Sequence, residues 1–526
     1  MRQGTSNCAR GPYRSRIGAA VKTRWFGAAI KLLPQCDHSS PTGGTLGADR
    51  TIRFRTMHQT ALASPCISFN LCNLPEDAMD YRGALSHQSS GVKAPPSVER
   101  TRARLFRIAI FVCVVSPVVD MAIWLIVHVW LGHDYTPALG YVRSWLRSLL
   151  FGATDENDSW QPMRLALAWL KEHPYGDVYA KLFFADHVKF QYPPSSLLPL
   201  YFLDSFGTSP TDVTLNRIGS FVVAANVIAS GAFALLLAKR SSVLFDLRYA
   251  CAILAAVATL SYSPLLKAFS LGQLQVWINA LFMMSVLAWV VEKQLLAGLL
   301  IGLICLLKPQ LALFVLWGVL RRHWRFCSGW LAAFGLGTAV SLAVFGLRNH
   351  LDYGSVMHAL SRTGEMYIKN QSINGFLNRL YVPSDVASDW QAHEFPPYHA
   401  LVYYGTLLTS VGLVGAALFV PLKGGSHRDV FDFLLAALTF TVASPIAWEH
   451  HYGVMPAVYI ALAFWLLTRS TSRWSWPAAA TLAASYLITD HWLGGSWMLG
   501  GVIATLWLLY WANLETRLPV TGHGSM

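Results

Sequence analysis

The chain has 526 residues, of which 54% are hydrophobic and 13% are charged. This composition excludes a set of ordinary soluble domains and predicts a polytopic membrane protein. The formal net charge of +13 lies largely in the N-terminal arm and in short loops between apolar runs. That placement is typical of the positive-inside rule and argues against nucleic-acid binding.

The eight cysteines show no CxxC or Cys/His metal spacing, and Cys113, Cys251 and Cys305 fall inside apolar runs. A cysteine in such a run is usually a small core residue. We therefore expect neither a disulfide framework nor a structural zinc site.

Residues 1–100 are rich in Arg, Ser, Thr, Gly and Pro and contain no apolar run that is long enough to cross a bilayer. They are predicted to form a disordered extension, and Trp25–Leu33 is too short and too polar for a signal peptide. Met57 and Met79 lie closer to the membrane part, so a downstream start of translation stays open. We assign no function to this extension.

The membrane domain, residues 101–515, opens with the basic cluster Arg102–Arg107 and the apolar run Ile108–Leu131. This run predicts a first transmembrane helix that leads out of the cytoplasm. Asp120 lies within it and is expected to face the bundle interior or water. The following loop, 132–192, contains a segment in which Trp160, Leu165, Leu167 and Leu170 predict a short amphipathic helix on the bilayer surface.

A series of apolar runs follows this first loop. They lie near 213–238, 247–266, 273–291, 294–308, 309–321, 327–346, 399–422, 429–447, 452–468, 475–490 and 492–511. With the first helix they predict about twelve transmembrane helices, within a range of roughly ten to thirteen. We interpret the short run Pro193–Phe206 as re-entrant or interfacial, because a crossing there would invert every later loop.

This topology places most basic loop residues on the cytoplasmic side, in agreement with the positive-inside rule. They are Lys239, Arg240, Lys293, Arg321, Arg322, Arg325, Lys423, Arg428, Arg469, Arg473 and Arg517. It predicts a multi-pass protein of the plasma membrane with both termini, including the tail 516–526, in the cytoplasm.

Polar segments then collect on the extracytoplasmic face. They are the first loop with its acidic patch 155–158, the edge Tyr192–Pro194, Ser270–Gln273, Lys308–Gln310, the second loop 348–398 and Glu449–His451. Acids, bases, cations and amides that converge at one membrane face are expected of a chemical site. The stretch Asp177–Leu200, where a polar loop runs into the membrane, is interpreted as its edge.

Several short motifs in these segments carry a family resemblance. They are KFQYPPSSLL (189–198), LGQLQ (271–275), LLKPQLAL (306–313), RRHWR (321–325), NQSINGFLNRL (370–380) and SPIAWEHHY (444–452). In order and spacing they resemble the bacterial polyprenyl-phosphate-mannose-dependent mannosyltransferases of glycosyltransferase family 87. The resemblance implies an all-α, C-type membrane glycosyltransferase fold and a polyprenyl-phosphate-linked donor, with mannose as the sugar. It does not specify the acceptor.

The implied reaction needs a base for the acceptor hydroxyl and groups that hold the departing phosphate. The family carries an acidic residue in the first outer loop before a Tyr and the YPP edge, and Asp158, Tyr179 and Tyr192 fit this layout. Asp158 is therefore the candidate base for an inverting displacement. Asp155 and Glu156 stay open as alternatives, and so does a merely solvated carboxylate.

His450 and His451 follow Glu449 at the end of an apolar run and are candidates to bind the carrier phosphate or to orient the acceptor. Adjacent helical residues point about 100° apart, so we expect only one of the two histidines to face the site. The spacing does not favour zinc, and the reaction requires no metal and no cofactor.

Lys308, Arg379 and Lys189 are the candidate phosphate-binding cations. The alternatives are a lysine that snorkels to the interface and an arginine on a surface loop. Further candidate contacts to the substrate or the donor phosphate are Asn370, Gln371, Gln273, Asn374 and Glu449. Tyr192 and the two prolines after it are expected to shape the site by packing.

Two other classes of function are kept as alternatives: a transporter or flippase of lipid-linked sugars, and a polysaccharide polymerase or ligase. A transporter predicts repeated halves that meet at the midplane, and no such repeat is apparent. The predicted partners are a polyprenyl-phosphate-sugar donor, a glycolipid or glycan acceptor and the bilayer. An inactive subunit stays open, and the oligomeric state is not predicted.

Overall fold

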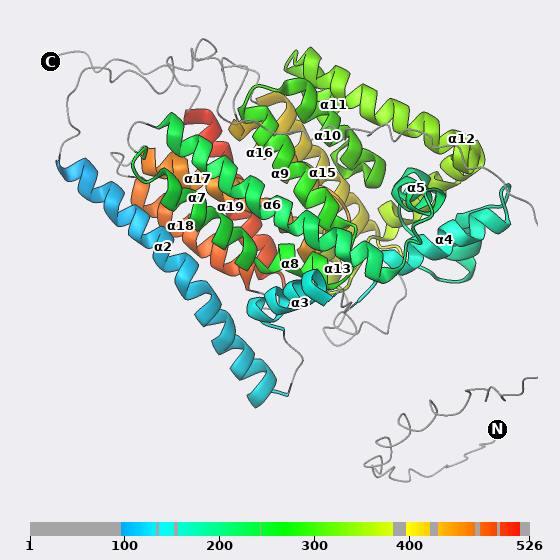
Figure 1. Ribbon diagram of the computed structural model, residues 1–526, viewed down its shortest axis with the longest axis horizontal. Helices are drawn as coiled ribbons and strands as arrows, with labels where there is room; N and C mark the ends of the chain where they lie inside the picture. Colours follow the sequence, from blue (N-terminus) through cyan, green and yellow to red (C-terminus); the bar gives the residue numbers. More distant parts are fainter. Residues whose placement is uncertain are drawn as a thin grey trace, which may run out of the picture. The chain divides into compact units, whose positions relative to one another are not determined.

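The computed structural model describes residues 96–132, 136–151, 156–241, 244–381, 396–420, 430–468, 474–491 and 495–515. Within these ranges every regular element is a helix, and the one β-type pairing is an isolated bridge between Asn370 and Trp448. The described residues belong to one compact unit, Asp77–Met526. An all-helical fold is therefore confirmed for this part of the chain (Figure 1).

The helices follow the apolar runs of the sequence. In chain order they are α2 (Pro96–Trp124), η2 (Leu125–Trp130), α3 (Ala138–Phe151), α4 (Trp160–Glu172), η3 (Tyr179–Ala185), η4 (Pro194–Leu197), α5 (Leu198–Ser205), α6 (Asp212–Arg240), α7 (Arg248–Ser261), α8 (Ser263–Ser270), α9 (Gln275–Val290), α10 (Gln294–Leu307), η5 (Pro309–Leu311), α11 (Phe314–Leu320), α12 (Trp324–Thr363), α13 (Ile373–Arg379), α15 (Ala400–Phe419), α16 (Val430–Val442), η7 (Glu449–Val454), α17 (Met455–Thr468), α18 (Ser475–Asp490) and α19 (Trp497–Glu515).

Six of the described helices or helix runs are long and apolar enough to cross a membrane. They are Val98–Trp130, Asp212–Arg240, Trp324–Thr363, Ala400–Phe419, Glu449–Thr468 and Trp497–Glu515. The pair α7 and α8 passes the same test together but is bent by 48° at Tyr262, just before Pro264 in the first turn of the second helix. A polytopic membrane protein is thus confirmed, whereas the count of twelve spans stays a prediction.

Two segments differ from the predicted boundaries. Helix α12 continues to Thr363 and fills the first part of the predicted loop 348–398, after a kink at Gly346, whose φ is 77°. No proline interrupts the sequence after this kink, so the helix resumes. The run Pro193–Phe206 forms two short helices, η4 and α5, and η4 packs against α10 and α12.

The predicted amphipathic helix of the first loop is present as α4. Its apolar face is covered by protein, because Trp160, Met163 and Leu167 are buried and α4 packs against α5 and α6. Leu165 is exposed instead. The interpretation that this face lies on the bilayer surface is therefore wrong for the buried residues.

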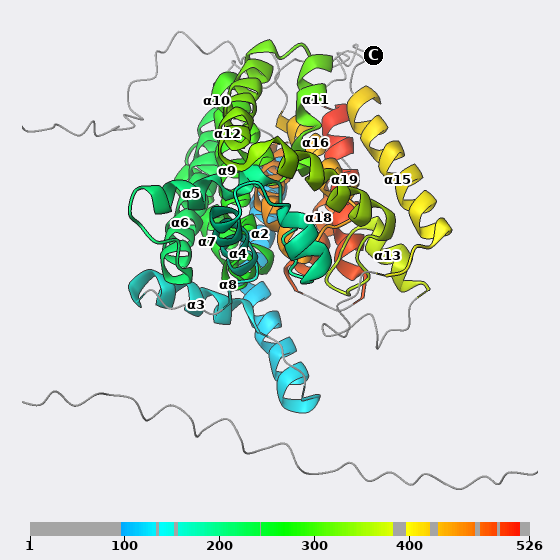
Figure 2. The ribbon, with the colours of Figure 1, turned by 90° about the vertical axis from the view of Figure 1, so that its right-hand side faces the viewer.

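Successive long helices run up and down, which separates two ends of the bundle. At one end, here called the basic end, Arg240 donates to the Val290 carbonyl at 2.9 Å and Arg102 to the Thr468 carbonyl at 3.5 Å. The buried pair Arg321–Asp432 lies there too, at 2.7 Å. The opposite end, here called the motif end, gathers residues 271–273, 308–310 and 449–451. The end of α2 beyond Asp120, together with η2, extends away from the other helices (Figures 1 and 2).

Candidate active site

Asp158 is held at the motif end by the turn between α8 and α9. The backbone N–H groups of Asp158 and Ser159 donate to the carbonyls of Leu271 and Gly272 at 2.9 and 3.1 Å. Gly272 has a φ of +62°, and an added Cβ would lie 2.8 Å from the Asn157 Cα. Only glycine fits this close approach of two backbones without strain. The turn therefore fixes where the acidic loop begins its helix.

The Gln273 side chain connects Asp158 to the Tyr192 edge. Its amide nitrogen donates to the Asp158 carboxylate, and its carbonyl oxygen accepts from Ser159 Oγ at 2.7 Å and, more weakly, from the Tyr192 hydroxyl at 3.4 Å. The hydroxyls of Ser159 and Tyr192 are 2.7 Å apart, and Tyr179 donates to the Tyr192 carbonyl at 2.7 Å. Ser159 and Tyr192 thus hold the Gln273 side chain, and Gln273 orients the Asp158 carboxylate.

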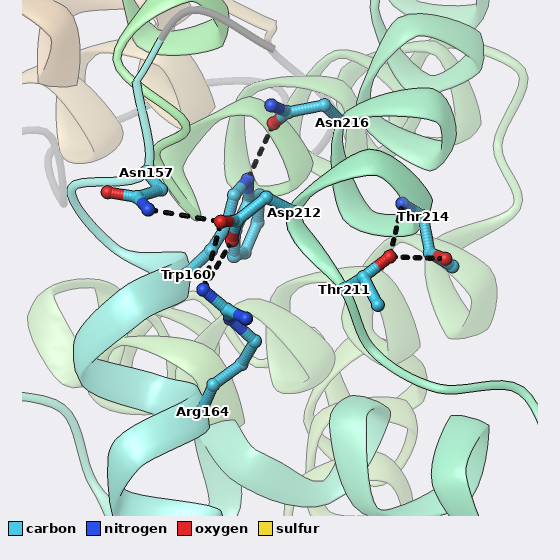
Figure 3. Close-up of polar contacts among 7 residues, drawn as sticks. All are labelled: Asn157, Trp160, Arg164, Thr211, Asp212, Thr214 and Asn216. Atoms are coloured by element: carbon cyan, nitrogen blue, oxygen red, sulfur yellow. Dashed lines mark hydrogen bonds and ion pairs between the residues drawn. The ribbon is translucent and has the colours of Figure 1, made fainter. Parts of the chain in front are cut away.

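A second set of contacts anchors the first turn of α4 on the start of α6 (Figure 3). The Asp212 carboxylate accepts from Asn157 at 3.1 Å and pairs with Arg164 at 2.9 Å, while the Trp160 indole donates to Asn216 at 2.8 Å. Thr211 caps the N-terminus of α6 through the backbone N–H of Thr214 at 3.2 Å. This clamp lies directly beside Asp158 in sequence.

The electrostatic surroundings of Asp158 make it a stronger base than a fully solvated aspartate. Although the residue keeps an exposed surface, removal of water by nearby protein atoms raises the pKa of its carboxyl. The Gln273 hydrogen bond and the charges of Lys189 and Lys308 oppose this shift. Of the alternative acids, Glu156 is exposed, and Asp155 lies outside the described residues.

Lys308 and His451 meet at the same end. Helix α10 stops at Leu307 before Pro309, and Lys308 Nζ lies 2.6 Å from His451 Nε2. One nitrogen must donate and the other accept, so the two groups are not both positively charged. Burial lowers the pKa of the Lys308 ammonium to about 7, and the charge of Asp158 opposes this shift.

His450 lies on the other side of this cluster, with its ring centroid 4.9 Å from that of His451 and nearly perpendicular to it. Its Nδ1 is buried without a hydrogen-bond partner among the described residues. Lys189 reaches Glu365 at 3.4 Å and is also within electrostatic range of Asp158. Of the predicted site residues, Asp158, Tyr192, Gln273, Lys308 and His451 are therefore close together at the motif end.

The amide-rich segment after α12 holds two loops together. Asn370 donates to the carbonyls of Glu365 and Pro445 and accepts from the Ala447 N–H, while the Gln371 amide donates to the carbonyls of Ile368 and Gly495. Both residues are fully buried. Their geometry supports a structural role and leaves no free amide for a ligand.

Arg379 and Asn374 also bind other protein groups and have a structural role. Arg379 donates to the Asn370 carbonyl and to Ser496 Oγ, both at 2.8 Å, and burial lowers the pKa of its guanidinium to about 10. The buried Asn374 accepts from Asn378 at 2.8 Å and donates to Thr406 at 3.2 Å. The structure does not bring Arg379 into contact with the Asp158 cluster.

Two lysines that the sequence analysis missed contact the predicted Glu449. Lys267 pairs with one carboxylate oxygen of Glu449, and Lys369 Nζ lies 3.6 Å from the other. The signal for Lys267 was its position beside an apolar run, where a lysine needs an anionic partner. Among the described residues, no group of three His, Cys, Asp or Glu side chains is placed to hold a metal ion.

Comparison with known proteins gives a family and two relatives. Residues 190–445 match Glycosyltransferase family 87. The polyprenol-phosphate-mannose-dependent alpha-(1-2)-phosphatidylinositol mannoside mannosyltransferase of Mycobacterium tuberculosis is 26% identical over 334 residues, which are 61% of this chain and 73% of the relative.

The polyprenol-phosphate-mannose-dependent alpha-(1-2)-phosphatidylinositol pentamannoside mannosyltransferase of Mycolicibacterium smegmatis is 26% identical over 274 residues, 48% of this chain and 62% of the relative. No solved structure gives a significant match. These matches confirm the resemblance that the motifs carried.

Proposed function

We propose that this chain is a membrane glycosyltransferase of the family 87 type, as the match of residues 190–445 and the two relatives suggest, and that it transfers mannose from a polyprenyl-phosphate carrier to a hydroxyl group of a glycolipid. The transfer takes place on the extracytoplasmic face and inverts the anomeric centre. The relatives' names specify phosphatidylinositol mannosides as their acceptors. For this chain the acceptor is proposed only as a glycolipid.

The observation that supports this proposal best is the position of Asp158 beside two cations. Its carboxylate is oriented by Gln273 and lies within electrostatic range of Lys189 and Lys308. Transfer from a phosphate carrier requires a base that accepts the hydroxyl proton and cations that stabilise the leaving phosphate, and this arrangement provides both. A transporter needs no such base.

In the proposed step, Asp158 accepts the proton of the acceptor hydroxyl as its oxygen attacks the anomeric carbon. The bond between that carbon and the phosphate oxygen breaks, and the phosphate leaves with the bonding electron pair. Lys308 and Lys189 stabilise the charge that develops on it. A single displacement inverts the anomeric centre, and Asp158 then releases its proton to water.

The other predicted site residues position the base and the cations or the loops around them. His451 accepts the Trp448 N–H at Nδ1, so its Nε2 donates to Lys308 and positions that side chain at 2.6 Å, and Tyr192 fixes Gln273. Asn370, Gln371 and Arg379 hold the loops that carry Glu449 to His451. Under this proposal they position other residues and do not touch the substrate.

The test is transfer of radiolabelled mannose from synthetic polyprenyl-phosphate-mannose to membrane glycolipids by the full chain. Asp158→Asn keeps the shape of the side chain but removes the base, and we expect a loss of roughly 100-fold or more. Asp186→Asn is the matched control, because Asp186 only pairs with the exposed Lys181. It is expected to keep full activity.

Two results would contradict parts of the proposal. If Asp158→Asn stays active while Asp155→Asn or Glu156→Gln is inactive, the base is another acid of the same loop. If the wild-type chain transfers no mannose but does transfer another sugar from the same carrier, the donor sugar is wrong.

A further inference from the structure

We propose that Asp490, at the end of α18, is a positioning residue for the transfer reaction. Its buried carboxylate holds the first turn of α8, and α8 in turn places two parts of the candidate site, the turn that binds Asp158 and the lysine that pairs with Glu449. This inference rests on the proposed function, because it assigns a further residue to that reaction. Asp490 acts through α8 and takes no part in the chemical step.

Asp490 belongs to a buried polar cluster of four side chains, which also contains Ser116, Asp120 and His491. Each of the four is at most 3% exposed. The Ser116 hydroxyl donates to the Asp490 carboxylate, and Ser116 Oγ lies 3.1 Å from His491 Nε2. His491 Nδ1 lies 3.6 Å from the Asp120 carboxylate. Ser116 and Asp120 are about one turn apart on α2, so the cluster connects the first membrane helix to the end of α18.

Both carboxylates of this cluster bind the first backbone N–H of a helix. The Asp120 carboxylate accepts from Ala138, the first residue of α3. Asp490 Oδ1 accepts from Ser263, the first residue of α8, at 2.8 Å. The first N–H groups of a helix have no partner within the helix, and a negative charge beside them is favourable. The cluster therefore determines where α3 and α8 begin, and these two helices pack against each other (Figure 1).

The other end of α8 carries the turn that holds the candidate base. Helix α8 has only eight residues, and the two carbonyls that follow it accept from the N–H groups of Asp158 and Ser159. It begins just after the 48° bend at Tyr262, so its direction depends on the contacts of its first turn. A helix of this length is about 12 Å long. A tilt at its start therefore displaces the backbone that binds Asp158.

The same helix also reaches the histidine side of the site. Lys267, in the last turn of α8, pairs with Glu449, and α8 packs against η7, which contains Glu449, His450 and His451. His451 in turn contacts Lys308, the proposed phosphate-binding cation. One short helix thus connects the part of the site that holds the base with the part that holds this cation.

A buried carboxylate is a costly way to hold two helices together. Asp490 is 3% exposed, and a charge that is removed from water is unfavourable even when it is hydrogen-bonded. An apolar residue of similar volume often stabilises a fold as well or better. Hydrogen bonds, unlike apolar packing, depend strongly on direction. The Asp490 carboxylate therefore favours a role in orienting α8 over a role in stability alone.

The experiment compares Asp490→Ala with the wild-type chain in two measurements. One is the mannose-transfer assay, and the other is amide hydrogen exchange of the full chain in nanodiscs, which needs no donor sugar. Asp490→Ala is expected to lower kcat roughly 10- to 100-fold, because a shift of about 1 Å at a catalytic group has an effect of that size. The N–H of Ser263 should exchange roughly 10-fold faster, because its hydrogen bond to a charged group is lost. Asp158 and Ser159 should also exchange faster, whereas α12 keeps its wild-type rates.

Asp490→Asn tests whether the hydrogen bonds or the charge matter. The amide oxygen still accepts from the Ser263 N–H and the amide nitrogen donates to Ser116 Oγ, so this variant should keep most of the kcat and of the protection from exchange. If Asp490→Asn loses as much kcat as Asp490→Ala while α8 stays protected, Asp490 acts through its charge and the positioning role is wrong.

Ser116→Ala is the milder variant, because it removes only the hydroxyl that holds the second oxygen of Asp490. It should change kcat and the exchange of α8 in the same direction as Asp490→Ala, by a smaller factor. If Asp490→Ala does not fold, Ser116→Ala decides: wild-type kcat together with wild-type exchange of α8 would overturn the proposal.

Ser485→Ala is the matched control. Ser485 is buried on the same helix, α18, and its hydroxyl donates to the Gly501 carbonyl of α19 at 2.7 Å. Its loss therefore removes a buried hydrogen bond of α18 that does not involve α8. The variant is expected to keep its kcat and the protection of α8. An equal loss of kcat in Ser485→Ala and Asp490→Ala would mean that general loosening of α18 explains both.

The positioning role and the proposed function fail separately. If the wild-type chain transfers no mannose but Asp490→Ala speeds exchange at Ser263, Asp158 and Ser159, the proposed function is wrong and the hold of Asp490 on α8 stands. If the wild-type chain transfers mannose and Asp490→Ala keeps both the wild-type kcat and the wild-type exchange, the function stands and Asp490 is not a positioning residue.

Discussion

The pKa of Asp158 is raised and that of Lys308 is lowered, so the two values lie closer together than usual and predict a pH optimum between them. The base works only when deprotonated, so kcat/KM rises with pH through an Asp158 pKa that is higher than the about 3.9 of an ordinary aspartate. In the proposed mechanism Lys308 stabilises the phosphate only when it is protonated, so kcat/KM falls as the pH rises through about 7. We expect a bell-shaped profile of kcat/KM against pH.

The Lys308→Arg variant tests which group causes the fall of kcat/KM at high pH, the falling limb of the profile. A guanidinium stays protonated over the whole accessible range, so the limb should move to higher pH while the rising limb stays in place. If the falling limb is unchanged in Lys308→Arg, another group is responsible and Lys308 does not bind the phosphate in its charged form.

At the residue scale, sequence reasoning found the groups that form short motifs and missed the isolated ones. Asp158, Gln273 and Tyr192 were predicted from separate motifs and are joined by hydrogen bonds in the structure. Lys267 was missed because its position beside an apolar run indicates that it needs an anionic partner but does not identify Glu449 as that partner. Asn370 and Gln371 were assigned to ligand binding because a sequence does not show that their amides bind main-chain groups.

At the element scale, the α8–α9 turn determines where α4 begins, and Gly272 makes this possible. Gly272→Ala introduces a Cβ against the backbone of Asn157 and forces the acidic loop to move. A shift of about 1 Å at a catalytic group can cost roughly 100-fold in rate. We expect a loss of kcat of that order in the mannose-transfer assay.

Gly207→Ala is the matched control for this substitution. Gly207 also has a positive φ, +79°, but an added Cβ would meet nothing within 4 Å. The variant should lose about 1–2 kcal/mol of stability from backbone strain alone and keep its kcat. If both variants lose activity equally, strain in general, and not the contact with the acidic loop, explains the effect of Gly272→Ala.

Element boundaries were predictable wherever an apolar run ended in a charge or a proline. Helix α6 spans Asp212–Arg240 against a predicted 213–238. Helix α12 was predicted to end near residue 346, because polar residues follow Gly346. Its continuation to Thr363 depends on packing against neighbours such as η3 and α15, which a single sequence does not display. Tertiary contacts often override local patterns in this way.

At the scale of the whole molecule, the arginines near the ends of the membrane spans and the candidate site residues lie at opposite ends of the bundle. Arg102, Arg240 and Arg321 lie at the basic end, whereas Asp158, Lys308 and Glu449 lie at the motif end. Basic residues near membrane spans are retained in the cytoplasm. The fold therefore favours an orientation in which the candidate site faces away from the cytoplasm.

This orientation predicts which positions a membrane-impermeant maleimide reaches in intact cells. Tyr175, at the end of α4, is 92% exposed, and Phe245, after α6, is 46% exposed. Tyr175→Cys should be labelled in intact cells and Phe245→Cys only after permeabilisation, because α6 runs from the motif end to the basic end between them. The unsubstituted chain, whose described cysteines are buried or half-buried, gives the background. The reverse pattern would place the Asp158 cluster in the cytoplasm, and the site would then have to use a donor presented on that side.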